Sequence, residues 1–121
     1  MDDISLEDSD ALTGRILVSY TYGNSQEHRC SVWAEMLVNV LVQIYSENPS
    51  GIKSLAKNES FGNIVFKNAE MNSDWAKIAN DLYVYKANST AAKLSILNRV
   101  FEGSGKDKSE LIFKLQPVKK S

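Results

Sequence analysis

The chain contains 121 residues, of which 43% are hydrophobic and 24% charged, and its formal net charge is −1 at pH 7. These values are typical of one globular domain with a single core. No apolar run approaches the ~20 residues that cross a bilayer, and the acidic N-terminus lacks the apolar core of a secretory signal, so we expect a cytoplasmic protein that does not bind membranes. Because Cys30 is the only cysteine, an internal disulfide is excluded and a metal cluster would lack its usual ligands.

The acidic side chains are concentrated at the start of the chain. Residues 1–10 hold five acidic side chains and no basic one, whereas residues 82–121 hold eight basic side chains and three acidic ones. We predict that residues 1–12 form a disordered acidic arm and that residues 118–121 form a basic tail, on either side of a single domain over residues 13–117. The basic half is either a solvated surface or one that faces a phosphate backbone or an acidic protein.

A β-hairpin is predicted at the start of the domain. Residues 15–21 place isoleucine, valine and tyrosine alternately on one face, which is the pattern of a strand. Residues 22–25 contain glycine and asparagine, which favour a tight turn. Residues 26–30 would return as a polar strand at the edge of a sheet.

A long apolar helix is predicted over residues 32–47. Ser31 would cap it, because the serine hydroxyl can accept a free N–H of the first turn, and Asn48 would end it, since the residue before Pro49 avoids helical angles. The apolar side chains cover more than half of the circumference: Trp33, Met36, Leu37, Val38, Val40, Leu41, Val42, Ile44 and Tyr45. Such a helix either is central to the core or has a second face that meets a partner. A short second helix is predicted over residues 50–57.

Residues 58–79 have a less regular pattern of apolar and polar residues. Residues 62–66 suggest a short strand. Residues 73–78 begin with Ser-Asp, which favours a capped helical turn, and this turn would bury Trp75.

The C-terminal part is predicted to form a strand–helix–strand unit. Residues 82–85 and 111–115 alternate as strands, and a helix begins near residues 88–90. This helix is long enough for a crossover, which would make the two strands parallel. The sequence therefore predicts an α+β fold, in which a small mixed β-sheet combines the N-terminal hairpin with the C-terminal β-α-β unit and two main helices pack on one face.

Few residues suggest catalysis. His28 is the only histidine and lies two residues before Cys30, so on a strand their side chains would share a face. A Cys–His nucleophile also needs an orienting group and an oxyanion site, which no pattern here indicates, and we interpret the pair as exposed edge residues. Residues 103–106 resemble a phosphate loop only in composition, because these glycines follow a helix instead of opening one. We predict no enzymatic activity, no cofactor, no metal and no small-molecule ligand.

Aromatic and basic side chains in the second half form a candidate binding surface. Tyr83 and Tyr85 share one face of a strand, where they either stack unpaired bases or support the helix that follows. Basic side chains on and around that helix could form a stripe. The candidate surface for a protein partner or a nucleic acid consists of Tyr83, Tyr85, Lys86, Lys93, Arg99 and Lys106.

The order of these elements resembles a small α+β domain that is often appended to bacterial restriction-type and phage-defence-type proteins. The matching residues are Ser31 and Trp33; Asn48 and Pro49; Tyr83 and Val84; Asn88, Thr90 and Ala91; Leu94, Leu97 and Phe101; Gly105 and Asp107; and residues 111–115. Two features depart from the family pattern. Val32 separates a serine and a tryptophan that are usually adjacent, and residues 58–79 are nearly neutral, whereas this segment often carries basic and aromatic residues in the family. The resemblance implies a free-standing copy that acts by binding.

We therefore predict a non-catalytic protein-binding or accessory module, belonging to a bacterial or phage defence-related system. It would dock on another protein or form a homodimer, through a sheet edge or the helix over residues 32–47. The alternative is a nucleic-acid-binding module that uses the basic half from Lys86 to Lys120.

Overall fold

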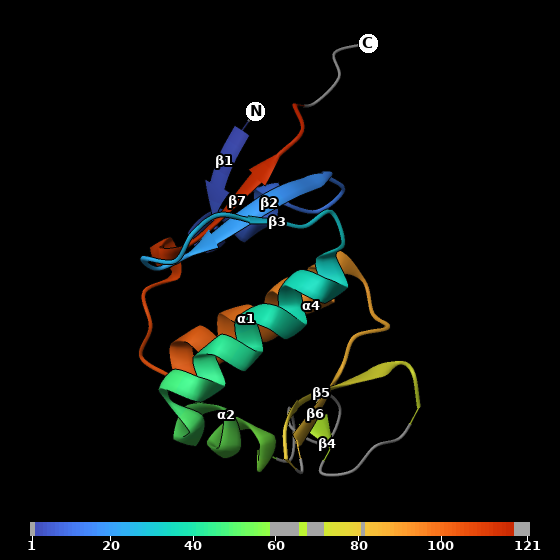
Figure 1. The fold of residues 1–121 in the computed structure, drawn as a ribbon, viewed down its shortest axis with the longest axis vertical. Helices are drawn as coiled ribbons and strands as arrows, with labels where there is room; N and C mark the ends of the chain where they lie inside the picture. Colours follow the sequence, from blue (N-terminus) through green and yellow to red (C-terminus); the bar gives the residue numbers. More distant parts are fainter. Residues whose placement is uncertain (1, 59–65, 68–71, 81, 118–121) are drawn as a thin grey trace.

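We analysed a computed structural model of the chain, which describes residues 2–58, 66–67, 72–80 and 82–117. In these residues two antiparallel sheets lie on either side of a layer of helices (Figure 1). The predicted α+β class is confirmed. None of the described helices has the length and apolar character needed to cross a membrane. The predicted basic tail, residues 118–121, lies outside the described residues.

The larger sheet has the strand order β1-β7-β2-β3, and all neighbours are antiparallel. Its strands are β1 (Asp2–Ser5), β2 (Leu17–Tyr22), β3 (His28–Arg29) and β7 (Leu111–Leu115). β2 and β3 form the predicted hairpin, whose turn contains Gly23 at φ +58°. Successive side chains of a strand point to opposite faces. In β7, Leu111, Phe113 and Leu115 are fully buried, whereas Ile112 is 41% exposed.

The α-helices described are α1 (Trp33–Glu47), α2 (Pro49–Ala56) and α4 (Thr90–Gly103). The predicted cap of α1 by Ser31 is wrong. The N-cap residue is Val32, and no side chain caps this end, because the backbone is still extended at Val32 and turns helical only after it. Asn48 ends α1 as predicted, and Pro49 begins α2, where its missing N–H has no helical partner to lose.

α4 has the boundaries that its sequence favours. The Ser89 hydroxyl caps the first turn by accepting a hydrogen bond from the Ala92 N–H at 3.1 Å, as expected for serine at this position. At the other end Gly105 has φ +66°, and the Lys106 N–H donates to the Phe101 carbonyl at 2.9 Å. Glycine suits this left-handed position because it has no Cβ.

The smaller sheet has the strand order β4-β6-β5. Its strands are β4 (Phe66–Lys67), β5 (Trp75–Ala79) and β6 (Leu82–Tyr85). β6 is the predicted strand, but the predicted helical turn over residues 73–78 is wrong. From Trp75, which lies opposite Tyr85, this segment pairs with β6, and the cross-strand pairing overrides the local capping signal. Of the strand predicted over residues 62–66, only Phe66 lies within the described residues.

α1 is central to the core. It packs against β2, α2, α4 and β5, so both sheets and both neighbouring helices contribute to its burial. Its fully buried or nearly buried side chains are Met36, Leu37, Val40, Leu41 and Ile44. Val42 is 42% exposed. The wide apolar surface of this helix is therefore explained mainly by burial within the chain.

The prediction of one mixed sheet with a parallel β-α-β unit is wrong. β6 belongs to the smaller sheet and β7 to the larger one, so α4 carries the chain from one sheet to the other. β7 lies between β1 and β2 and is antiparallel to both. The crossover rule applies only to two strands of the same sheet, and here β6 pairs instead with its local neighbours β4 and β5.

The prediction of a disordered arm over residues 1–12 is wrong from Asp2 onward. β1 pairs with β7 along its whole length, and the 3-10 helix η1 (Leu6–Ala11) follows it. Leu6 and Leu12 are fully buried, and Arg15 Nη2 lies 2.6 Å from Asp2 Oδ2. The burial of two leucines and the pairing of one edge strand attach this segment to the folded domain, while most of its acidic side chains are exposed to solvent.

Candidate functional site

One face of the larger sheet is open. α1 and α4 lie beneath the other face, and in the part of the chain that the structure describes no helix covers this one (Figure 1). Two cross-strand rows of residues lie on this open sheet face: Ser5–Ile112–Thr21 and Asp3–Lys114–Ser19. The hydroxyl side chains beside Ile112 are short, so they leave space on both sides of this exposed apolar residue.

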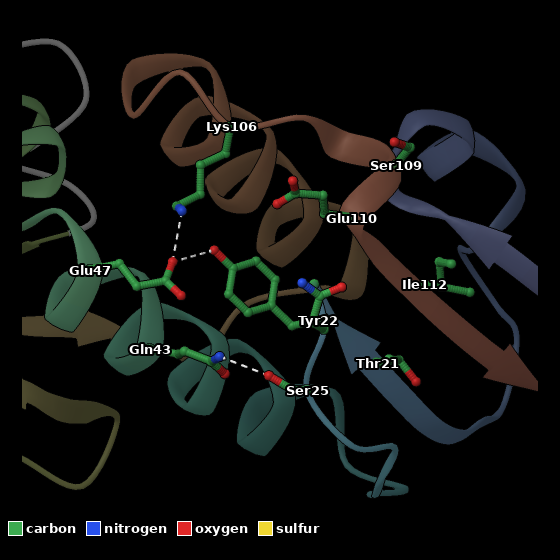
Figure 2. Close-up of a pocket in the computed structure, with 11 residues that line it drawn as sticks. Thr21, Tyr22, Ser25, Gln43, Glu47, Lys106, Ser109, Glu110 and Ile112 are labelled. Atoms are coloured by element: carbon green, nitrogen blue, oxygen red, sulfur yellow. Dashed lines mark hydrogen bonds and ion pairs between the residues drawn. The ribbon is translucent and has the colours of Figure 1, made fainter.

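Three adjoining hollows extend along the open sheet face and around its end beside the hairpin turn, and together we call them the sheet groove. The hairpin cleft, of about 550 Å³, lies between the β2–β3 turn, the end of α1 and the segment that joins α4 to β7 (Figure 2). The central hollow measures about 250 Å³, and the third, beside β1 and η1, about 560 Å³. Ile112 lines all three, Thr21 lines the first two and Asp3 the last two. The hollows therefore form a band in which each adjoins the next around Ile112.

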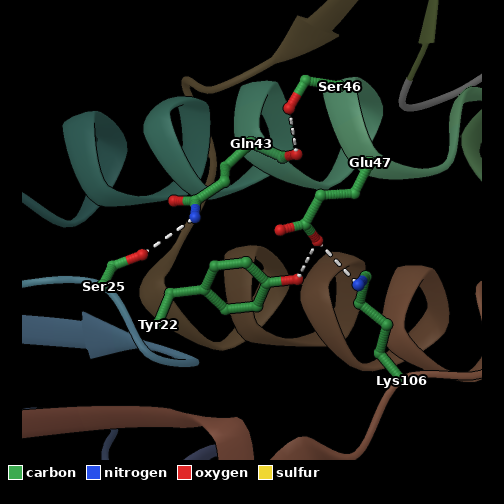
Figure 3. A network of polar contacts seen from close by, with 6 residues as sticks. All are labelled: Tyr22, Ser25, Gln43, Ser46, Glu47 and Lys106. Carbon is green, nitrogen blue, oxygen red and sulfur yellow. Dashed lines mark hydrogen bonds and ion pairs between the residues drawn. The ribbon is translucent and has the colours of Figure 1, made fainter.

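A cluster of polar side chains lines the inner wall of the hairpin cleft and links the elements that form it (Figure 3). The Tyr22 hydroxyl donates to Glu47 Oε1 at 2.8 Å, and Lys106 Nζ lies 2.7 Å from the same oxygen. Lys106 Nζ also lies 5.7 Å from the centre of the Tyr22 ring. Beside the cluster, Gln43 Nε2 donates to Ser25 Oγ at 3.0 Å. These contacts join β2, the hairpin turn, the end of α1 and the loop after α4.

The cluster holds each of its three groups in one protonation state at neutral pH. Burial raises the pKa of the Tyr22 hydroxyl to about 12. The hydrogen bond with Lys106 lowers the pKa of the Glu47 carboxyl, and the same contact raises the pKa of the Lys106 ammonium. A general acid or base works best when its pKa lies near the operating pH. The three groups are therefore better suited to linking β2, α1 and the loop after α4 than to transferring protons.

Alkaline pH is expected to weaken this cluster. A group whose folded pKa is raised contributes stability below its unfolded pKa, and that stability is lost as the pH rises to the folded value. For Tyr22 the window runs from 10.0 to about 12. Across it we expect the unfolding free energy of the wild type to fall by about 2 kcal/mol more than that of Tyr22→Phe. Urea unfolding at several pH values measures this, and equal falls in the two proteins would contradict the raised pKa.

A second polar cluster lies in the central hollow. The Ser19 hydroxyl, which is fully buried, donates to Glu27 Oε2 at 2.6 Å. Lys114 Nζ lies 3.4 Å from Glu27 Oε1. The hydrogen bond from Ser19, together with the charge of Lys114, lowers the pKa of the Glu27 carboxyl. Glu27 thus reaches from the hairpin over β2 to β7.

The sheet groove is acidic. Its charged lining residues are the carboxylates Asp3, Asp8, Glu27, Glu47 and Glu110 and the ammonium groups Lys106 and Lys114, which is an excess of three negative charges. Both ammonium groups already lie beside a carboxylate of the groove. The groove therefore presents a negative potential to any molecule that approaches it.

The structure separates the candidate residues predicted from sequence. Tyr83 and Tyr85 are half-buried on β6 in the smaller sheet, and the predicted sharing of one face is confirmed by the burial of Leu82 and Val84 on the other. The centres of the Tyr85 and Trp75 rings are 5.1 Å apart, so sequence reasoning missed Trp75 as a neighbour of these tyrosines.

Of the four predicted basic side chains, Lys86 and Lys93 lie near each other, since burial and then the charge of Lys86 lower the pKa of Lys93, whereas Lys106 lines the hairpin cleft beside Glu47. Lys93 is only 7% exposed, and its Nζ donates to the carbonyl of Asn88. Lys86 is half-buried, and Arg99 is exposed on α4. Burial and ion pairing thus remove two of the four predicted basic residues from the freely accessible surface.

His28 and Cys30 each have a contact of their own. The His28 ring stacks on Tyr20, with the ring centres 5.3 Å apart. The Cys30 thiol donates to the Val32 carbonyl at 3.2 Å. Within the described residues, no group of three or more histidine, cysteine or acidic side chains is placed to hold a metal ion.

Sequence reasoning missed the sheet groove, although one of its signals was visible. The alternation over residues 111–115, which directs three apolar side chains inward, also directs Ile112 outward. The contributions of Asp3 and Asp8 were hidden by the assignment of their segment to a disordered arm.

Comparison of the chain with models of protein families, with curated proteins and with solved structures found no match. The resemblance to appended defence-type domains therefore stays a prediction.

Proposed function

We propose that this chain is a non-catalytic binding module that docks another protein on the sheet groove. The band of adjoining hollows around Ile112 carries the proposal. Protein interfaces combine an apolar centre with a polar rim, and Ile112 with the polar side chains around it has this order. The resemblance to appended accessory domains supports the same role, as a component of a bacterial or phage defence-related system.

The chemistry of the groove favours a protein over other ligands. Its excess of negative charge repels a phosphate backbone. A second copy docked face to face would bring like charges together, which is unfavourable. Homodimerisation through α1 has little support either, since the apolar side chains of that helix are mostly buried within the chain.

A matched pair of substitutions tests docking on the groove. Ile112 and Val42 are branched apolar residues with 41% and 42% exposure, but Ile112 lies in the groove and Val42 on α1. We expect Ile112→Arg to reduce partner capture from cells that express the protein at least roughly tenfold, as for a residue near the centre of an interface, while Val42→Arg keeps capture at the wild-type level. Capture is quantified by affinity purification and mass spectrometry, after unfolding curves establish that both variants are folded. Equal capture by the wild type and Ile112→Arg would reject the proposal.

Nucleic-acid binding remains the alternative, and one observation favours it. Trp75 and Tyr85 are cross-strand partners, and Lys77 lies opposite Tyr83 in the same sheet. Half-exposed aromatic rings beside a lysine can stack unpaired bases. Salt-sensitive binding of a single-stranded oligonucleotide that is lost on Tyr83→Ala or Tyr85→Ala, and kept in Ile112→Arg, would favour this alternative over docking on the groove.

A further inference from the structure

We infer that the partner presents a positively charged extended segment to the sheet groove, with basic side chains beside Asp3, Asp8 and Glu110. This inference rests on the proposed docking function and adds the chemistry of the partner. Its basis is the placement of these three carboxylates around Ile112 on an otherwise uncovered sheet face.

The three carboxylates come from different elements. Asp3 lies on β1, Asp8 on η1, and Glu110 at the end of the 3-10 helix η2 (Lys108–Glu110), two residues before Ile112. All three side chains are exposed, and within the described residues none of them has an ion-pair partner. An incoming cation would therefore meet carboxylates that hold no cation of their own.

The resident lysines leave this charge uncompensated. Lys106 forms an ion pair with Glu47 at 2.7 Å, and Lys114 forms one with Glu27 at 3.4 Å. The contact with Glu47 raises the pKa of Lys106, so this pair persists at neutral pH. Complementary charge for the rest of the groove must come from the partner, because buried or partly buried charges at an interface need opposite partners.

The spread of the groove favours a chain segment over a single ion. The carboxylates line separate parts of the band, with Glu110 in the hairpin cleft and Asp8 in the hollow beside η1. No described group of three acidic, histidine or cysteine side chains is placed to hold a metal ion. An extended peptide places every second side chain on the same side about 7 Å apart. Basic side chains at positions i and i+4 can therefore reach carboxylates on either side of Ile112, while an apolar side chain at position i+2 packs on Ile112.

Two triple variants separate the charge of the groove from the charge of the whole chain. Asp3→Asn/Asp8→Asn/Glu110→Gln removes the three carboxylates without changing side-chain size. The control, Asp10→Asn/Glu35→Gln/Asp74→Asn, removes the same charge from exposed positions that line none of the three hollows. Because all six positions are exposed, both variants are expected to fold as the wild type does.

The probe is a fluorescent peptide in which lysine and valine alternate at every second position, with serine between them, so that both types face the groove. Its binding is followed by fluorescence anisotropy at physiological ionic strength. We expect the groove variant to bind it about tenfold more weakly than the wild type, since three exposed charge contacts of modest strength are lost. The control variant should stay within about twofold of the wild type, because none of its three carboxylates lines a hollow and salt screens exposed charges that the peptide does not contact. A matching peptide with glutamate in place of lysine should not bind. Equal binding by the groove and control variants, or no binding by the wild type, would overturn the inference.

Failure of the basic partner segment can be distinguished from failure of docking itself. If Ile112→Arg abolishes capture of the cellular partner while the groove variant retains it, docking on the groove stands and a basic partner segment is rejected. If Ile112→Arg leaves capture unchanged, both the docking function and the inference fail.

Discussion

Replacement of Phe113 by alanine is expected to lower the free energy of unfolding by about 3–5 kcal/mol. Phe113 is fully buried at the middle of β7, the strand that lies between β1 and β2. Its ring lies 5.4 Å, centre to centre, from that of Trp33 on α1. Truncation would open a cavity where the larger sheet meets the helical layer, and such a cavity adds to the lost burial of the ring.

The neighbouring residue on the other face supplies the control. Ile112→Ala is expected to change stability by no more than about 0.5 kcal/mol, because this side chain is partly exposed and packs on the open face. Urea unfolding followed by far-ultraviolet circular dichroism measures both variants. Similar losses for Phe113→Ala and Ile112→Ala would contradict the assignment of the two faces of β7.

Leu6→Ala is expected to cost about 2–5 kcal/mol of unfolding free energy. Leu6 is fully buried at the start of η1, within a segment whose composition is otherwise acidic. Glu7→Ala removes the adjacent exposed side chain and should cost less than about 0.5 kcal/mol.

Urea unfolding of Leu6→Ala and Glu7→Ala therefore decides whether residues 2–12 are part of the folded domain. A Leu6→Ala variant as stable as the wild type would contradict the pairing of β1 with β7 and restore the interpretation of this segment as a disordered arm.

Local patterns predicted the elements whose signals lie within a few residues of each other. The alternation of residues 111–115 gave a strand with the correct inward face, and Ser89 marked the start of α4 through its hydroxyl. The same local signal failed at residues 73–78, where Ser-Asp suggested a helical turn. There the pairing of Trp75 with Tyr85 decides the structure, and a strand partner ten residues away is not visible in a capping pattern.

The candidate site was less predictable, because it is assembled from distant parts of the chain. Glu47 and Lys106 meet although 59 positions separate them, and no pattern within either segment signals that contact. Lys93 looked like a surface residue from its type alone, yet its place on the inner side of α4 buries it. Charge counted along the sequence thus predicted a basic binding surface, whereas folding produces an acidic groove on the opposite sheet.

The Tyr22–Glu47–Lys106 cluster gives the groove a fixed end. It ties the sheet to α1 and to the loop after α4 with contacts of 2.8 and 2.7 Å. A surface that is already formed loses less conformational entropy when a partner binds. A docking role therefore fits a groove whose walls are held by internal contacts.

The most direct test of docking on the sheet groove is site-specific photo-crosslinking. A photoreactive phenylalanine analogue is placed at Ile112 in one variant and at the equally exposed Val42 in another, and both are irradiated in cells that express the protein. Docking on the groove predicts a discrete protein adduct from the Ile112 variant and none from the Val42 variant. An adduct of equal yield from both positions, or an Ile112 variant that gives none, would contradict it.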